Sequence, residues 1–224
     1  AYKSNDNGQA ARILEQVKID SLLPAQQIFA STLQAELALA RNKPKTALKA
    51  LNHPSMERLS ELPVEQQVRT QLVRAKALAA TGQPLQAARE RIFIAPLLSG
   101  SAGNANHQAI WALIDSLSTS QLQSSGDSDL DGWLALARAA KSTGTPEQQQ
   151  AAIDAWREKN PQHPAAQSLP EQLNQLKQLA TQPLSKIALL LPQDGPLAAV
   201  AQALGDGFMA DYYQGQQGYQ STPT

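Results

Sequence analysis

Three segments of the chain share the pattern that most constrains its fold. In each, a short polar or glycine-containing break is followed by a proline, and runs of periodic apolar residues lie on both sides. The segments cover residues 40–48, 80–88 and 142–151, with Pro44, Pro84 and Pro146 as their prolines. Proline is tolerated in the first turn of a helix, because the N–H that it lacks would have no partner there. Each segment is therefore predicted to be the tight turn of a helical hairpin.

The runs before these turns have the spacing of helix faces, with apolar residues every three or four positions. They consist of Phe29, Leu33, Leu37 and Ala40, then Val68, Leu72, Ala75 and Ala79, then Leu130, Trp133, Leu134 and Ala137. The second helices of the hairpins are predicted at about 44–51, 84–95 and 146–159, and further helices near 104–118 and 170–181. Thr145 with Gln148, and Ser168 with Glu171, have the spacing of capping boxes.

Repeated hairpins predict a tetratricopeptide-like α-solenoid over residues 1–183. One hairpin cannot bury its apolar face alone, so neighbouring hairpins must stack. Ala, Leu and Gln dominate the chain, and all three favour helices. The repeat is irregular, since Pro44 and Pro84 are 40 residues apart and Pro84 and Pro146 are 62 apart. A strict tetratricopeptide array repeats at about 34 residues.

The pattern changes after Pro183. Residues 186–192 form a short apolar run that suits a buried parallel strand, and a turn at 193–196 leads into a helix-like stretch from Leu197 to about Tyr213. Residues 184–224 are therefore predicted to open an incomplete α/β domain. Ligands of open α/β sheets bind beyond the carboxyl ends of the strands, so Gln193, Asp194 and Gly195 are a candidate ligand loop. An ordinary strand-to-helix turn is an equal alternative.

Charge and composition exclude several functions. The 19 basic and 19 acidic residues balance, which argues against nucleic-acid binding and against a polybasic membrane reader. No cysteine is present, so disulfides, thiolate metal sites and cysteine nucleophiles are excluded. No apolar run is long enough to span a bilayer.

No motif predicts a catalytic residue, a metal ligand or a cofactor, and we expect a protein that is not an enzyme. Residues 127–132 match half of a calcium-binding loop, but Arg138 stands where the bidentate Glu is required, so capping of a helix N-terminus is the better interpretation. His53, His107 and His163 lack metal-ligand spacing and are predicted to be turn residues. Trp133 and Trp156 are predicted to fill the core, and Trp111 is either core or a partner anchor.

Residues 185–208 resemble the first strand and helix of type I periplasmic binding-protein domains. Their coupling to upstream hairpins is more specific. Residues 131–136, 155–161, 163–166 and 169–170, in this order, resemble the LpoA family of penicillin-binding protein activators. The resemblance covers most of the chain and is clearest over 130–210.

The resemblance implies a lipoprotein on the periplasmic side of the outer membrane that activates a class A penicillin-binding protein, a bifunctional peptidoglycan synthase, by protein contact. Peptidoglycan is a second candidate partner. The lipid-bearing Cys of the family is absent from this sequence, so the anchor is an expectation, and the surface that meets the synthase is not indicated. Two alternatives remain open: a periplasmic solute receptor with a helical spacer, and a general tetratricopeptide adaptor that clamps peptides with Arg69, Arg74 and Lys76.

Overall fold

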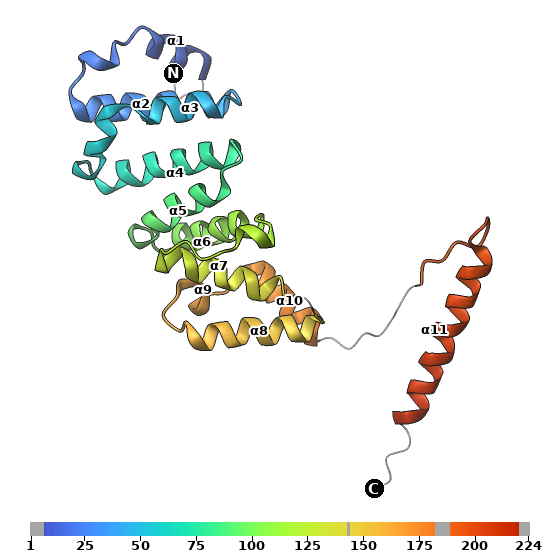
Figure 1. Ribbon diagram of the computed structural model, residues 1–224. Coiled ribbons are helices and arrows are strands. Elements are labelled where there is room, and N and C mark those ends of the chain that lie inside the picture. The colour runs from blue at the N-terminus through green and yellow to red at the C-terminus, as the bar shows by residue number, and fades with distance from the viewer. Residues whose placement is uncertain (1–6, 143, 182–188, 220–224) are drawn as a thin grey trace. The chain divides into compact units, whose positions relative to one another are not determined.

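The computed structural model describes residues 7–142, 144–181 and 189–219, and every regular element in these ranges is helical. The chain divides into two compact units, Ala1–Thr181 and Gln182–Thr224, which are described separately (Figure 1). The first unit is a stack of helical hairpins, as the turn pattern predicts. The second contains one long helix.

The helices of the first unit for which ranges were predicted agree with those ranges to within four residues, whereas the helices Asn7–Glu15 and Pro164–Gln167 were not predicted. The helices of this unit are α1 (Asn7–Glu15), α2 (Pro24–Ala40), α3 (Pro44–Leu51), α4 (Val64–Ala80), α5 (Pro84–Ile94), α6 (Gly100–Asp115), α7 (Ser128–Ala140), α8 (Pro146–Lys159), α9 (Pro164–Gln167) and α10 (Glu171–Thr181). Short 3₁₀ segments connect them: η1 (Ile19–Ser21), η2 (Pro54–Glu61), η3 (Ala95–Leu97) and η4 (Thr119–Gln121). The pairs α2–α3, α4–α5 and α7–α8 are hairpins, and each stacks on a following helix.

The first two hairpin turns are built in the same way. Asn42 and Gly82 adopt left-handed backbone conformations, with φ of 56° and 76°. The N–H of the next residue reaches back to the last turn of the preceding helix, from Lys43 to Ala38 O at 2.8 Å and from Gln83 to Leu78 O at 3.0 Å. This is the Schellman arrangement, which satisfies carbonyls that a helix end leaves without partners. The prolines that follow start α3 and α5.

The predicted capping boxes have different outcomes. Before α8, the N–H of Thr145 donates to Gln148 Oε1 at 3.1 Å and the N–H of Gln148 donates to Thr145 Oγ1 at 3.4 Å, which confirms that box. Ser168 instead follows α9, and Glu171 is the first residue of α10. The backbone N–H of Glu171 donates to Gln108 Oε1 at 3.2 Å. The second box is therefore wrong, because a partner from α6 supplies the acceptor.

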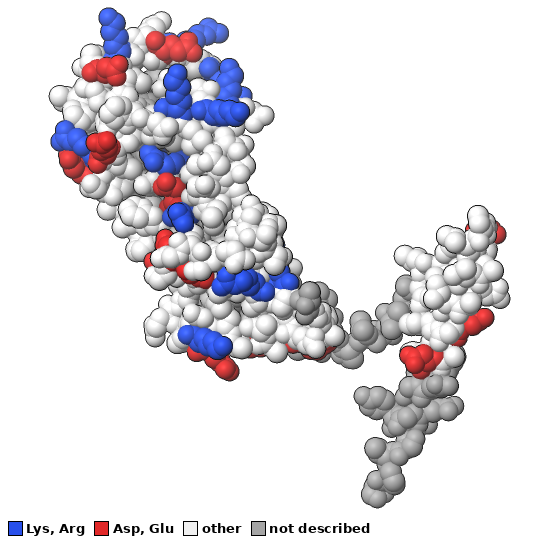
Figure 2. Space-filling view, viewed as in Figure 1, with Lys and Arg blue, Asp and Glu red and all other residues white. Residues whose placement is uncertain are grey.

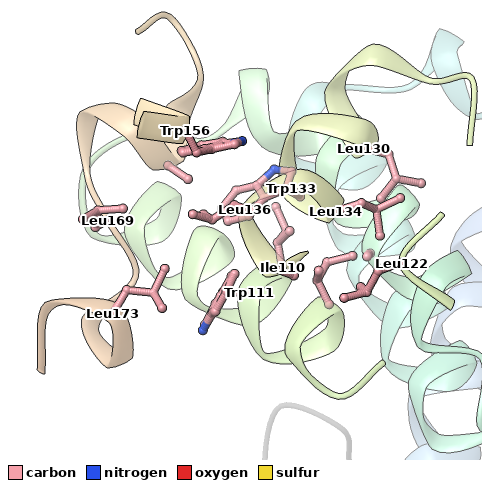
Figure 3. Packing of buried hydrophobic residues seen from close by; sticks show 14 of the residues in the cluster. Ile110, Trp111, Leu122, Leu130, Trp133, Leu134, Leu136, Trp156, Leu169 and Leu173 are labelled. Carbon is pink, nitrogen blue, oxygen red and sulfur yellow. The ribbon is translucent and has the colours of Figure 1, made fainter. Parts of the chain in front are cut away.

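The largest core lies in the C-terminal half of the first unit (Figure 3). It contains all three tryptophans, Trp111, Trp133 and Trp156, together with leucines and isoleucines from α6, α7, α8 and α10. The predicted core positions of Trp133 and Trp156 are confirmed, and Trp111 is core as well. Its indole Nε1–H donates to Gln172 Oε1 at 2.7 Å and links α6 to α10.

The N-terminal half packs through small residues, and here the predicted helix faces are partly wrong. On α2, Phe29 is 46% exposed, whereas Ile28, Ala35 and Leu37 are buried. Because α2 contacts α1, α3 and α4, its small residues allow close packing on several sides and the longest apolar side chain is left outside. The guanidinium of Arg69 lies over the Phe29 ring, 5.3 Å from its centroid. Ala79 on α4 is likewise exposed.

The second unit departs from the predicted fold class. Its helix, α11 (Ala198–Tyr219), confirms the predicted helix, but Leu189–Leu191 has no regular structure, and the first part of the predicted strand, 186–188, lies outside the described residues. A strand needs a neighbour to pair with its backbone groups. Among the described residues of this unit, none supplies one, so the predicted α/β start is seen only as its helix.

Candidate functional site

A cavity of about 330 Å³ opens in the C-terminal half of the first unit. Helices α5, α6, α7 and α9 and the segment η3 contribute its walls. Its apolar wall includes Ile92, Pro96, Leu98 and Ile110, and its polar lining includes His107, Asp129, His163 and Gln167. Apolar cavities with a few convergent polar groups are the usual form of a ligand or partner site.

His163 is fixed in this cavity by its position at the start of α9. Its Nδ1 accepts a hydrogen bond from the N–H of Ala165 at 3.2 Å, so the imidazole caps the helix and Pro164 follows as the first helical residue. The ring lies edge-on to Trp133 and to Trp156, with centroids 5.1 Å apart in both pairs. His53 caps η2 in the same way, through the N–H of Ser55 at 3.2 Å.

The predicted turn role is thus confirmed for His53 and His163 and wrong for His107, which lies within α6. The His107 ring faces Trp133, with centroids 6.1 Å apart. Burial lowers the pKa of both cavity histidines, and for His163 the backbone and carboxylate of Asp129 oppose this effect. The lowered pKa values favour the neutral form of both imidazoles at neutral pH, and the side chain of Asp129 lines the cavity beside them.

The acidic segment at the start of α7 is a capping structure, as predicted. Asp127 Oδ1 accepts from the N–H groups of Asp129 and Leu130, at 3.1 and 3.3 Å. The Asp131 carboxylate accepts from the hydroxyls of Ser124 and Ser125 and from backbone N–H groups, which lower its pKa to about 2. Over the described ranges, no group of three or more His, Asp or Glu side chains is arranged to hold a metal ion.

The basic residues that a peptide clamp would need are not brought together. Arg69 forms two hydrogen bonds with the Glu36 carboxylate, at 2.7 and 2.6 Å. Arg74 donates to Leu51 O at 3.0 Å. Only Lys76 is left on an exposed surface of α4.

The candidate loop Gln193, Asp194 and Gly195 is exposed and precedes α11. Gly195 adopts a left-handed conformation with φ of 88°, and its carbonyl accepts the N–H of Ala198 at 3.1 Å. This geometry suits a turn into a helix, and its role toward a ligand stays a prediction. The cavity between His107 and His163 was not predicted. The His-Pro pair at 163–164 was the available signal, because it marks a helix start.

The fold defines a helical-repeat protein, a scaffold of stacked hairpins with a cavity in its C-terminal half. Within the described ranges, no helix combines the length and apolar character that crossing a membrane requires. The family described as LppC putative lipoprotein matches residues 1–224. The chain belongs to this family, and it corresponds to the N-terminal domain region of its LpoA members.

Relatives and solved structures agree with this assignment. The chain is 33% identical over 195 residues to penicillin-binding protein activator LpoA of Photobacterium profundum, covering 84% of this chain and 31% of that protein. Full-length LpoA of Haemophilus influenzae matches with a TM-score of 0.66 at 25% identity, over 93% of this chain and 38% of that one. The amino-terminal domain of E. coli LpoA matches with a TM-score of 0.62 at 25% identity, over 84% and 80%. The chain spans about a third of the length of the relatives named activators.

Proposed function

We propose that this chain is the helical region of a non-catalytic activator of a class A penicillin-binding protein, acting by protein contact from the periplasmic side of the outer membrane. The observation that carries the proposal is the family match over the whole chain, together with relatives named penicillin-binding protein activator at about a third identity. The family description as a lipoprotein supports attachment to a membrane through a lipid.

The structure gives this role a physical basis. Stacked hairpins form an extended scaffold whose length grows with each repeat, so they can carry a contact surface away from an anchor. Two exposed side chains that are adjacent in sequence to residues lining the cavity provide such a surface: Phe93 of α5 is 68% exposed and Leu97 of η3 is 42% exposed. Exposed aromatic and apolar side chains next to a cavity are typical of protein contacts.

We further propose that residues 184–224 open an α/β domain that the relatives complete, and that Gln193, Asp194 and Gly195 border its ligand cleft. Exposed apolar side chains support this proposal because they need a cover: Leu197 lies directly before α11, and Val200 and Leu204 lie on it. Peptidoglycan itself is a further candidate partner, which a sacculus pull-down would test.

The decisive experiment measures glycan cross-linking by a class A peptidoglycan synthase alone, with this chain, and with the corresponding full-length protein. Stimulation by the full-length protein supports the activator role. The fraction of that stimulation which this chain produces alone assigns the activity to one region. Phe93→Ala is expected to reduce that fraction, and Leu23→Ala, whose side chain is 69% exposed on the N-terminal half, is the matched control. If neither folded protein stimulates the synthase, the solute-receptor alternative takes precedence.

That alternative has its own readout. A receptor is stabilised by its ligand, because binding to the folded state alone raises the free energy of unfolding. Thermal unfolding of the full-length protein with candidate solutes would then show a shift that the first unit alone does not show.

A further inference from the structure

A second concave surface, which shares no lining residue with the histidine cavity, lies along α4, α5 and α6. It is an open groove of about 650 Å³. Its floor consists mainly of small side chains, with Ala75, Ala79, Ala109 and Ala112 among them. Methyl groups form an apolar surface on which small side chains of an extended segment can pack closely.

The charged side chains of this groove are both cationic, Lys76 from α4 and Arg91 from α5. The guanidinium Nη1 of Arg91 donates to Asn106 Oδ1 at 3.0 Å, and Asn106 Nδ2 donates to the Arg91 carbonyl at 2.9 Å. Asn106 is only 3% exposed, so this reciprocal pair holds Arg91 in one orientation. The arginine is positioned, but its partner is a neutral amide.

Arg91 differs in this respect from three other basic residues of the fold. Arg69, Lys141 and Arg157 each lie within ion-pair distance of a carboxylate. Among the residues that the structure describes, no carboxylate forms an ion pair with Arg91, and burial lowers the pKa of its guanidinium. A half-buried positive charge without a counter-ion favours binding of an anion.

We propose that this groove binds the carboxylate of an extended peptide, held by Arg91 and Lys76, with small side chains of the peptide packed on the alanine floor. A guanidinium forms paired hydrogen bonds with a carboxylate, which gives direction as well as attraction. The apolar floor favours a peptide over a free inorganic anion, because it buries carbon atoms that such an anion lacks. This inference does not depend on the activator role.

The test titrates the purified chain with an acetylated tetra-alanine peptide that has a free C-terminal carboxylate, and with the same peptide as a carboxamide. Binding is followed by NMR chemical shifts. The free acid is expected to bind about tenfold more tightly than the amide, which is the usual size of a charge-assisted hydrogen bond. The preference should weaken as salt is raised, because the groove is open.

Three variants assign the binding to the groove. Lys76→Gln changes an exposed side chain, and Arg91→Gln removes the positioned charge; both should reduce the preference for the acid several-fold and leave amide binding unchanged. Arg89→Gln is the matched control, because Arg89 is an exposed arginine on the same helix. Amide signals of the floor alanines verify that each variant is folded.

Several outcomes would overturn the proposal. Equal affinity for the acid and the amide would show that the carboxylate is not recognised. An unchanged preference for the acid in folded Lys76→Gln and Arg91→Gln proteins would show that the peptide does not bind in this groove. Displacement of the peptide by an equal concentration of acetate would show that the groove binds simple anions and that the alanine floor adds no affinity for a peptide. None of these results depends on a synthase, so failure here and failure of the cross-linking assay are distinguishable.

Discussion

At the scale of single residues, the absence of a side chain at Gly132 leaves the space that the His163 ring occupies in the histidine cavity. Gly132 lies in the first half of α7, where a Cβ atom would come within 2.5 Å of His163 Cδ2 and 2.7 Å of Nε2. The glycine therefore lets the imidazole lie directly on the helix backbone between Trp133 and Trp156. A helix-weakening residue is kept at this point because a ring occupies the space of its side chain.

Gly132→Ala should therefore destabilise the fold, although alanine favours helices. The added methyl must push the imidazole away from both indole rings, and overpacking of this kind costs about 1–3 kcal/mol. Urea unfolding measures the change. Gly103→Ala on α6 is the control, because its Cβ would meet nothing closer than 3.4 Å, and it should be neutral or stabilising. Equal effects of the two substitutions would contradict the role assigned to Gly132.

His163 should also make stability depend on pH. Burial lowers its pKa in the folded protein below the ordinary value near 6.5, so the unfolded chain binds the proton more readily. The stability contributed by the neutral ring is complete above about pH 6.5 and is lost as the pH falls below it. His107, whose pKa burial also lowers, acts in the same direction.

The variant His163→Asn separates titration from capping, because an asparagine side chain can still accept the N–H of Ala165. We expect it to be less stable than the parent at pH 8, where ring packing is lost, but to lose less further stability on going to pH 5. Unfolding curves at the two pH values provide the comparison. Parallel losses in both proteins would show that His163 does not carry the pH dependence.

At the scale of elements, local rules allowed most of the fold to be predicted. Prolines after polar breaks gave the starts of α3, α5 and α8, because a helix start depends on a few adjacent residues. The buried side of α2 was not predictable in the same way. It depends on α1, α3 and α4 packing around one helix, so Ile28 is buried and Phe29 is not.

The candidate sites could not be predicted from local sequence either. The histidine cavity joins α5, η3, α6, α7 and α9, and the groove joins α4, α5 and α6, so both depend on contacts between different elements. The predicted strand is not seen in its described part, Leu189–Leu191, for a related reason: among the described residues of the second unit no neighbouring strand is present, and an apolar run alone does not form a strand.

Helices α2 and α4 are joined by a buried pair of hydroxyls that can be tested directly. Thr32 Oγ1 donates to Ile28 O at 2.8 Å, so its hydrogen is committed and the Thr70 hydroxyl must donate to Thr32 Oγ1 at 2.9 Å. Both residues are fully buried. Each single valine substitution should cost about 1–2 kcal/mol, whereas Thr32→Val with Thr70→Val should cost less than the sum, since no unpaired hydroxyl is left. If urea unfolding showed that the losses of the two single variants add up to that of the double variant, the two hydroxyls would not be coupled by this hydrogen bond.

At the scale of the whole molecule, the first unit carries mixed surface charges and all three core clusters. Figure 2 shows blue and red side chains interspersed over the visible face of the first unit. This agrees with the balance of 19 basic and 19 acidic residues and leaves recognition to local features such as the groove. The two units differ in their interiors. The three core clusters are made only of residues from the first unit, whereas α11 carries Val200, Leu204 and Met209 on exposed surfaces.

This difference predicts how the chain unfolds. Removing residues 182–224 should leave the midpoint of thermal unfolding within about 2 °C, because a loss of 1 kcal/mol shifts a protein of this size by about 2–4 °C and no residue of the three core clusters is removed. The helical signal of α11 should fade gradually on heating, because α11 contributes no residue to the three core clusters and a helix without such packing unfolds with little cooperativity. Removing residues 168–224 is the control: it also deletes Leu169, Leu173 and the Gln172 partner of Trp111, and it should lower the midpoint clearly. A large drop already in the shorter deletion would show that the second unit stabilises the solenoid.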